Sequence, residues 1–399
     1  MTLSAKLVFF MKFSPYRIIS FGYIFCLLAL VIYSYTQIDL NLTLSGNLIY
    51  QQVQGQLIFL GYFQRHLSAL IYSLIQLIMF GLYFYLMRQV LSHRLNLQQI
   101  VKLILLVSVI AILSYPALSH DIFNYMFDAR IVTKYHLNPY FFKANDFPGD
   151  LWVRFMHWTH RYYPYGPIWL ILTLPFSYLG FGKFVLTLMN FKLMFFLFHL
   201  GNLYLINKIT QKLYPEDRLT SLVFYGLNPL IISESLVSPH NEVMMLFFAL
   251  AALYWGALQN SRMKYIILMI LSAGVKFITI ALLPLILFKK HINDKSVLEF
   301  MIKSSLILTV LFISLEIYYR EAYPWYFIIF IGFSSLLIKY KKLLVFTFIL
   351  SLSALGRYVP FLYEGVYSDN LQRTKNIIFY LPIIVCLIYY IFSLRRLKQ

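Results

Sequence analysis

Charged side chains are scarce in this chain of 399 residues, since Lys, Arg, Asp and Glu make up 12% of it. A typical soluble domain carries about 25%. Hydrophobic residues make up 60%, which is more apolar surface than a soluble protein of this length can enclose in its core. A membrane-spanning helix needs about 20 apolar residues, so roughly 12 spans would accommodate this fraction. The composition excludes a soluble enzyme with a single anchor.

Acidic residues and cysteines are rarer still. Asp and Glu number 15 against 34 Lys and Arg, a net charge of +19. In a membrane protein such an excess marks the cytoplasmic ends of the spans, so we expect membrane lipids and no nucleic acid as partners. Cys26 and Cys386 both lie in apolar runs, so we expect neither a disulfide framework nor a cysteine metal site.

The apolar runs are continuous, which excludes the alternating pattern of an outer-membrane barrel. They predict an all-α polytopic membrane protein with about 11–13 transmembrane helices. Because no repeat or linker interrupts the chain, we expect one integral domain over 1–399. We interpret the first run, which follows Lys6, Lys12 and Arg17, as an uncleaved span. The runs are 18–36, 67–87, 103–118, 167–180, 184–207, 219–236, 242–258, 265–288, 300–319, 325–338, 342–357 and 377–394.

Basic residues orient these spans, because Lys and Arg collect on the cytoplasmic side. They place both termini and the loops 88–102, 208–218, 259–264, 289–303 and 339–342 in the cytoplasm, and the loops 37–66, 119–165 and 358–376 outside. With this orientation, one of the two helices in 166–207 must be partial or re-entrant and cannot cross the whole membrane. The run 265–288 must be a hairpin that turns near Gly274, Val275 and Lys276. Broken helices are tolerated where protein or a cavity covers the freed backbone.

The longest outer loop holds most of the reactive side chains. Asp121 is expected to follow the outward end of a span directly, where a carboxylate can act as a general base. Asp128 is seven residues further on, so a helix would place both on one face with Tyr125 between them. We expect Asp128 to be more solvated. His120 and Arg130 flank these residues, and an ordinary interfacial acid is the alternative interpretation of Asp121.

Three prolines on the outer side, Pro167, Pro239 and Pro324, are expected to open helices, with Ser238 as an N-cap for the second. Helix N-termini expose free N–H groups and favour anions. Simple helix punctuation would explain any one of these prolines. The three together predict an anionic ligand near the outer surface. The second segment also carries His240, Asn241 and Glu242.

Further candidates lie at the outer ends of apolar runs. Lys276 and Arg320 are cations at or near membrane depth, which indicates either function or contact with lipid headgroups. Tyr323 and Trp325 could form a platform for a sugar or an isoprenoid, or part of an aromatic belt. Glu234 lies near the end of its span, where a structural role beside an unidentified base would suit it.

The order of these features resembles that of bacterial GT-C glycosyltransferases that use a polyprenyl-phosphate sugar donor. It is most similar to the polyprenol-phosphate-mannose-dependent mannosyltransferases and their relatives in glycosyltransferase family 87. The resemblance covers about 115–330 of the chain. It is carried by Asp121, Asn138-Pro139-Tyr140, Tyr165-Gly166-Pro167, Asn228-Pro229, His240-Asn241-Glu242, Val275-Lys276 and Tyr323-Pro324-Trp325-Tyr326.

This resemblance implies a GT-C-type helical bundle in a bacterial inner membrane, with the active site on the extracytoplasmic side. It implies inverting transfer of a hexose, with mannose favoured, from a polyprenyl-phosphate donor to a hydroxyl of a lipid-linked glycan or glycolipid. Asp121 would be the catalytic base. The substrate-binding residues would be Asp128, Tyr125, His120, Arg130, His240, Asn241, Glu242, Lys276, Arg320, Tyr323 and Trp325.

No cofactor is expected. Asp121 follows His120 where some metal-using GT-C enzymes carry an adjacent acid pair, so metal dependence is left open. A flippase or transporter of a lipid-linked saccharide is an alternative, although such proteins favour inverted repeats. A non-catalytic membrane assembly protein is another, and it leaves the reactive outer loop without an explanation.

Overall fold

The computed structural model of the protein describes residues 15–259, 261–291 and 295–396. Over these residues the chain forms helices and no β-strand, which confirms the predicted all-α class. Lys6 and Lys12 lie outside the described residues. The longer elements are α2 (Pro15–Ser34), α3 (Leu48–Ile58), α4 (Arg65–Leu91), α5 (Leu97–Ala111), α6 (Asp121–Thr133), α7 (Pro167–Tyr178), α8 (Phe184–Leu213), α9 (Arg218–Gly226), α11 (Glu242–Ala251), α12 (Arg262–Val275), η8 (Phe277–His291), α13 (Lys295–Tyr319), α14 (Phe327–Ser334), α15 (Lys341–Gly356), α16 (Tyr358–Glu364) and α17 (Asp369–Arg396).

Shorter 3-10, π or α segments join these helices. They are η1 (Tyr35–Gln37), η2 (Phe59–Phe63), η3 (Ala144–Asp146), η4 (Leu151–Phe155), η5 (Pro215–Asp217), α10 (Pro229–Ile232), η6 (Ser233–Val237), η7 (Ala252–Leu258) and η9 (Pro324–Tyr326).

Each predicted apolar run contains a helix, but the helices differ in length. Six described helices are long and apolar enough to cross a membrane, and a seventh span results if the bent pair 215–226 and 229–237 counts as one. Five shorter apolar helices account for most of the difference from the predicted number of spans. The six long helices are Tyr16–Gln37, Arg65–Leu91, Phe184–Leu213, Lys295–Tyr319, Lys341–Glu364 and Asp369–Ser393.

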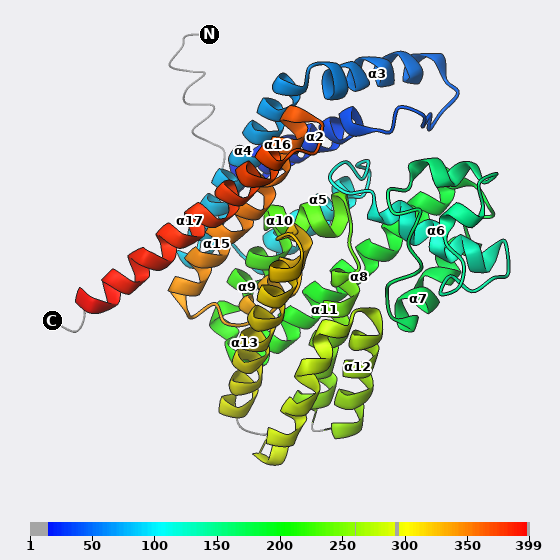
Figure 1. The fold of residues 1–399 in the computed structure, drawn as a ribbon. Coiled ribbons are helices and arrows are strands. Elements are labelled where there is room, and N and C mark those ends of the chain that lie inside the picture. Colours follow the sequence, from blue (N-terminus) through cyan, green and yellow to red (C-terminus); the bar gives the residue numbers. More distant parts are fainter. Residues whose placement is uncertain (1–14, 260, 292–294, 397–399) are drawn as a thin grey trace, which may run out of the picture.

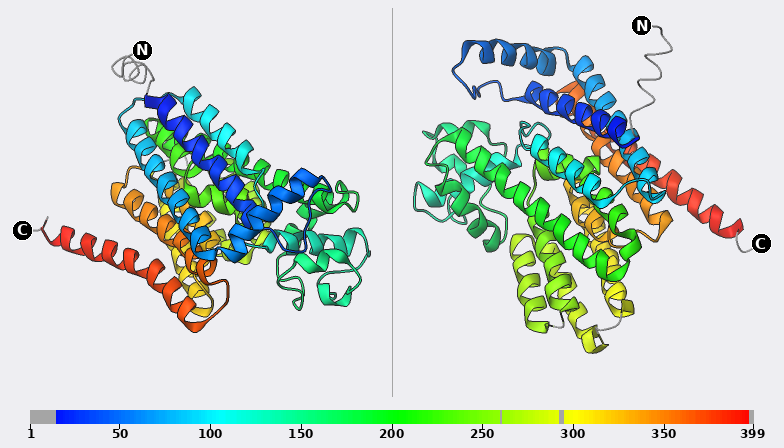
Figure 2. Two further views of the ribbon diagram at one scale, coloured as in Figure 1. Left: turned by 90° about the horizontal axis from the view of Figure 1, so that it is seen from above. Right: turned by 180° about the vertical axis from the view of Figure 1, so that it is seen from behind.

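The helices pack around a buried central segment. α8 contacts α9 and α11, while α2 packs on α4 and α5. Figures 1 and 2 show α6 and α7 together at one side of the bundle and α15 beside α17 at the other. Every residue from 220 to 246 is buried. This segment contains Glu234, His240 and Glu242, so these ionisable groups lie within the protein core and not on a solvated surface.

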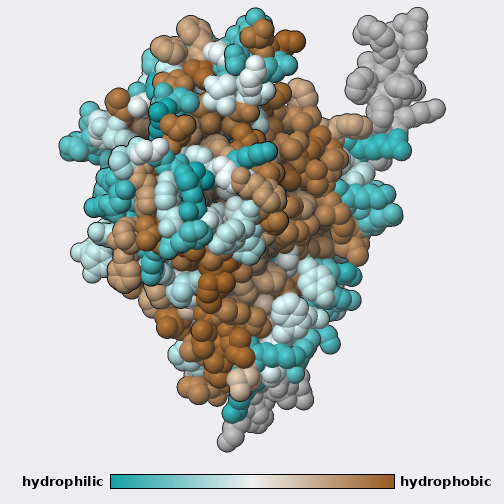
Figure 3. Space-filling model, turned by 90° about the vertical axis from the view of Figure 1, so that its right-hand side faces the viewer, coloured by the Kyte–Doolittle hydropathy of each residue, from teal (hydrophilic) through white to brown (hydrophobic). Residues whose placement is uncertain are grey.

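Hydrophobic side chains cover much of the surface. On the face in Figure 3, brown side chains form a broad area and teal ones gather at its margins. The best 18-residue window of Asp369–Ser393 is only 11% buried, so α17 presents apolar side chains such as Ile384, Tyr389 and Phe392 outward. An exposed apolar surface of this extent is suited to lipid. The protein is therefore an integral membrane protein.

The broken helices follow their local sequence. Asn228 caps α10 by accepting the N–H of Leu230 at 2.9 Å, and Pro229 occupies the first helical position. This break bends the pair 215–226 and 229–237 by 50°. Between α12 and η8 the chain is extended at Lys276, and Tyr265 donates a hydrogen bond across the hairpin to the carbonyl of Leu282 at 2.9 Å. The predicted hairpin is therefore present.

Two predictions about helix boundaries are wrong. α5 ends at Ala111, so Asp121 does not directly follow a span; Pro116 lies in the connecting segment, where proline opposes helix continuation. Pro239 does not open α11, which begins at Glu242. Ser238 does not cap α11, because its hydroxyl accepts the N–H of Leu118 at 2.9 Å. α7 and η9 do begin at their prolines, as predicted.

A glycine contact joins two of the motifs that carry the family resemblance. A Cβ placed on Gly166 would lie 2.2 Å from the carbonyl oxygen of Gly274. The N–H of Gly166 donates to the carbonyl of Val275 at 3.4 Å. Only glycine permits so close an approach of two backbones. This contact fixes the start of α7 against the break that carries Lys276.

Candidate active site

Asp121 lies where α6 meets the loop that precedes α11. It occupies the first turn of α6, and its carboxylate oxygen Oδ2 is 3.8 Å from Nε2 of His240, in the loop before α11. The side chain of Asp121 is 18% exposed, whereas that of His240 is 1% exposed. A carboxylate that is enclosed but still accessible suits a group that receives a proton from a bound substrate.

His240 connects Asp121 to a second carboxylate. Its Nδ1 lies 3.1 Å from Oε2 of Glu234, which is fully buried. The other oxygen of Glu234 accepts the hydroxyl of Tyr358 at 3.0 Å. The imidazole is therefore held between two acids, and the further acid is itself anchored. Glu234 has the basic partner that the sequence left unidentified, and that partner is His240.

Burial and charge act against each other at this pair. Burial raises the pKa of Asp121, while the charges of His240 and Lys276 oppose this rise and Glu242 adds to it. Burial alone would lower the pKa of His240, but its contact with Glu234 and the charge of Asp121 outweigh burial and raise it. A protonated His240 therefore stabilises the ionised form of Asp121.

Aromatic rings extend this arrangement. The ring of Trp325 stacks on His240 with centroids 4.1 Å apart. Tyr323 stacks on the ring of Trp325 with centroids 4.5 Å apart and an interplanar angle of 8°. The two aromatics that the sequence singled out thus form one stack that ends on the imidazole of His240. Flat aromatic faces of this kind offer apolar contact area beside polar groups.

Lys276 and Arg320 both interact with one tyrosine, Tyr326. Lys276 forms an ion pair with Glu242, and its ammonium nitrogen lies 4.8 Å from the centroid of Tyr326. Arg320 also interacts with Tyr326. Its side chain is 65% exposed and lies 3.6 Å from Glu316. The cations are therefore close to a shared neighbour, and Arg320 is the more accessible.

Asp128 has a different environment from the one expected. It is partly buried, and burial raises its pKa to about 8. Among the described residues it has no ion-pair partner, and both it and Asp121 interact electrostatically with Tyr165. The two acids of α6 therefore face a common neighbour, as their spacing predicts. Asp128 is a carboxyl group that stays largely protonated at neutral pH.

Three other predicted site residues, His120, Tyr125 and Asn241, lie near Asp121 or His240 in structure or sequence. His120 hydrogen-bonds to His157, and His157 in turn interacts with Asp121. Tyr125 is buried edge-to-face against Trp169 at 4.9 Å. Asn241 is buried, and its side-chain amide nitrogen has no partner within the described part of the chain.

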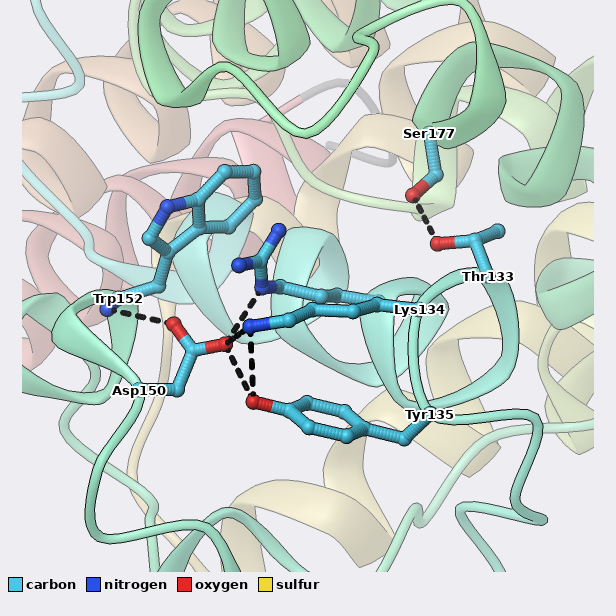
Figure 4. Close-up of polar contacts among 7 residues, drawn as sticks. Thr133, Lys134, Tyr135, Asp150, Trp152 and Ser177 are labelled. Atoms are coloured by element: carbon cyan, nitrogen blue, oxygen red, sulfur yellow. Dashed lines mark hydrogen bonds and ion pairs between the residues drawn. The ribbon is translucent and has the colours of Figure 1, made fainter.

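Arg130 contributes to a separate cluster in the outer loop (Figure 4). Asp150 accepts hydrogen bonds from Arg130 at 2.7 Å, Lys134 at 2.9 Å and Tyr135 at 2.7 Å. The guanidinium carbon of Arg130 lies 3.9 Å from the centroid of Trp152. These contacts tie the C-terminal turn of α6 to η4. The geometry gives Arg130 a role in holding the loop, so substrate contact by Arg130 stays a prediction.

A buried lysine that the sequence left without a role joins the two segments that carry Asp121 and His240. Lys192, on α8, donates to the carbonyl of Ser114 at 2.6 Å and to that of Val237 at 3.0 Å. Ser114 precedes α6, and Val237 ends η6. The hydrogen bond from Leu118 to Ser238 joins the same segments. The sequence offers one signal for Lys192, namely that an ionisable residue is unusual within an apolar helix.

Sequence reasoning also missed His157 and Tyr358. His157 was one of several loop histidines, and Tyr358 is one of 33 tyrosines, so neither carried a distinguishing signal. Across the described ranges, no group of three or more His, Cys, Asp or Glu side chains could hold a metal ion. We derive no step through a metal.

One comparison with known proteins gave a match. The family model described as "Alpha-(1->6)-mannopyranosyltransferase, N-terminal domain" matches residues 38–289, more than half of the chain. No curated protein and no solved structure matches the chain. The matched region contains Asp121, Glu234, His240 and Lys276, and it ends before the aromatic stack.

Proposed function

The chain belongs to this mannosyltransferase family, and from that premise we propose that it transfers mannose from a polyprenyl-phosphate donor to a hydroxyl of a lipid-linked glycan or glycolipid. Family membership confirms the expectation of a membrane glycosyltransferase of the GT-C type. The donor, the acceptor, the extracytoplasmic face of a bacterial inner membrane and the inverting course belong to the proposal. So does the α-(1→6) linkage that the family description names.

The enclosed acid–imidazole–acid arrangement is the observation that carries this proposal. Inverting transfer by single displacement needs one base at the acceptor hydroxyl. Asp121 suits that task, since its carboxylate is accessible and adjoins His240. Glu234 suits the task of orienting the imidazole from its buried side. The aromatic stack beside His240 offers a surface for the sugar ring.

The proposed step balances without a cofactor. The acceptor hydroxyl oxygen bonds to the anomeric carbon of the mannosyl group, and the bond from that carbon to the phosphate oxygen breaks. The electron pair leaves with the polyprenyl phosphate, and the hydroxyl proton moves to Asp121. A protonated His240 favours the ionised carboxylate before the step. We assign to Asp128, whose pKa is raised to about 8, the donation of a hydrogen bond to the acceptor.

The leaving phosphate needs positive charge where its own negative charge develops. Lys276 and Arg320, which both interact with Tyr326, are the candidates. The ion pair with Glu242 holds Lys276 in position. Arg320 is accessible enough to reach a lipid phosphate from the membrane surface. We assign the donor phosphate to this pair.

Transfer by purified protein in proteoliposomes tests the base. With labelled polyprenyl-phosphate mannose and a glycolipid acceptor, Asp121→Asn should lower turnover by about 10²–10⁴-fold while donor binding survives. Asp128→Asn is the matched control, because it removes the other acid of α6 and should act through acceptor binding. Normal turnover in Asp121→Asn would move the base to another residue.

The donor-phosphate assignment has its own test. Lys276→Gln and Arg320→Gln should each weaken retention of the labelled donor. Unchanged retention in both would contradict the assignment and leave the two side chains as headgroup contacts. The same proteoliposomes address the flippase alternative, because donor that crosses between leaflets without any product would support transport and not transfer.

A further inference from the structure

A large apolar groove lies between α4, α15 and α17. Its volume is about 1240 Å³, above the roughly 300–1,000 Å³ of most small-molecule sites. Apolar side chains form most of its lining, among them Leu77, Val345, Pro382 and Val385. Figure 1 shows α17 leading away from the other helices toward the C-terminus, beside α15.

The groove extends along the length of α15 and ends at two lysines. Gly356 and Val359 line it at the end near Tyr358, which contacts Glu234 of the site. Lys341 and Lys342 line it at the start of α15. The helix from Lys341 to Gly356 has 16 residues, or about 24 Å at 1.5 Å per residue. An anion at the lysines therefore lies about 24 Å along α15 from the end of the groove near Tyr358.

Charge at that end of the groove is unbalanced. Lys341 and Lys342 are both exposed, and neither forms an ion pair within the described ranges. The ammonium of Lys342 contacts the hydroxyl of Ser393 at 3.4 Å and the ring of Tyr390 at 5.7 Å. Among the residues that the structure describes, no acidic side chain lines the groove. An apolar channel that ends in two uncompensated cations is complementary to an anionic amphiphile.

We propose that the groove between α4, α15 and α17 binds an anionic phospholipid of the leaflet opposite the active site. Its phosphate lies between Lys341 and Lys342, and its acyl chains occupy the apolar groove toward Gly356. Basic pockets between transmembrane helices are known recognition sites for anionic headgroups. The donor lipid is a different molecule, because its phosphate must reach the anomeric carbon near Asp121.

Native mass spectrometry of the full-length protein tests this site. Phosphatidylglycerol and phosphatidylcholine with identical acyl chains are supplied at equal concentration. One phosphatidylglycerol should be retained preferentially by the unaltered protein. Lys341→Gln with Lys342→Gln should weaken its retention roughly 30-fold, since each lysine contributes about 1 kcal/mol near an anionic surface and about 1.4 kcal/mol corresponds to tenfold.

A matched control removes the same charge elsewhere at that end of the bundle. Lys208 and Lys212 lie in the last turns of α8, next to Tyr214, which shares Glu299 with Lys339. Lys208→Gln with Lys212→Gln should leave phosphatidylglycerol retention unchanged. Equal losses in both double variants would overturn the site, because net charge alone would then explain binding.

A third variant separates the groove from the cations. Val345→Trp fills the groove and keeps both lysines, so it should also release the lipid. Persistent retention in Val345→Trp would overturn the placement of the acyl chains. Displacement of the lipid by millimolar inorganic phosphate would overturn the lipid site, because the lysines would then bind any small anion. Equal retention of the two lipids by the unaltered protein would overturn the proposal as a whole.

Discussion

Gly166→Ala tests the glycine contact on which the placement of Lys276 depends. Gly166 has φ −72° and ψ 160°, a conformation that alanine adopts freely, so the substitution introduces only a steric conflict. The new Cβ would lie 2.2 Å from the oxygen of Gly274 and 2.6 Å from its carbon. Contacts of a Cβ below 3.0 Å are essentially never found, so the two segments must separate by about 0.8 Å or more.

Such overpacking costs about 1–3 kcal/mol of unfolding free energy. The same displacement moves Lys276 relative to the site, and a misplacement of about 1 Å can cost roughly 100-fold in rate. Thermal unfolding in detergent and mannosyl transfer in proteoliposomes would measure the two effects. Both values should fall in Gly166→Ala.

Gly81→Ala is the matched control, because no atom lies within 4 Å of a Cβ at that position in α4. Alanine is favoured over glycine in a helix by about 0.5–1 kcal/mol, so this variant should be as stable as the unaltered protein or slightly more so. If Gly166→Ala behaves like Gly81→Ala in both assays, the two backbones are not in contact and the reasoning is refuted.

Four further predictions concern charge and orientation. The transfer rate should fall as the pH drops through the pKa of Asp121, since a base must be ionised. Burial raises that pKa, so the fall should occur above about pH 3.9, the ordinary aspartate pKa. A kcat/KM that falls only at the ordinary value would contradict the role of Asp121 as base. Burial alone would raise the pKa of Asp150, but hydrogen bonds from Arg130 and its neighbours lower it. The ionised carboxylate should therefore stabilise the outer loop above about pH 3.9, the ordinary aspartate pKa. This stability should be lost as the pH falls through the lowered pKa of Asp150. Asp150→Ala should cost about 3–5 kcal/mol by leaving Arg130 buried without its partner, measurable as proteolytic cleavage of the loop, and cleavage unchanged from the unaltered protein would count against the cluster. Single cysteines at the exposed positions His160 and Gln211 should react with impermeant reagents from outside and from the cytoplasm respectively, and the opposite pattern would reverse the proposed topology.

The sequence determined the class of protein and some of its helix boundaries. Continuous apolar runs and scarce charge require a helical membrane protein, because no other fold buries that much apolar surface. Pro167 and Pro324 mark helix starts, since proline fixes φ and lacks an N–H. The break at Lys276 was also predictable from local sequence, because Gly274 and a charged residue interrupt two apolar stretches there. The order of the motifs from Asp121 to Tyr326 indicated the family.

Tertiary structure alone decided which side chains meet. Glu234 lies 124 positions from Tyr358 in sequence, and no local pattern pairs them. Ser238 was expected to cap a helix, yet its hydroxyl bonds to Leu118, 120 positions away, because packing offered a partner in another segment. Lys276 and Glu242 carry opposite charges in separate runs, and only the folding of α12 onto α11 brings them together. Periodicity and turn chemistry act over a few residues, whereas these pairings depend on how distant helices pack.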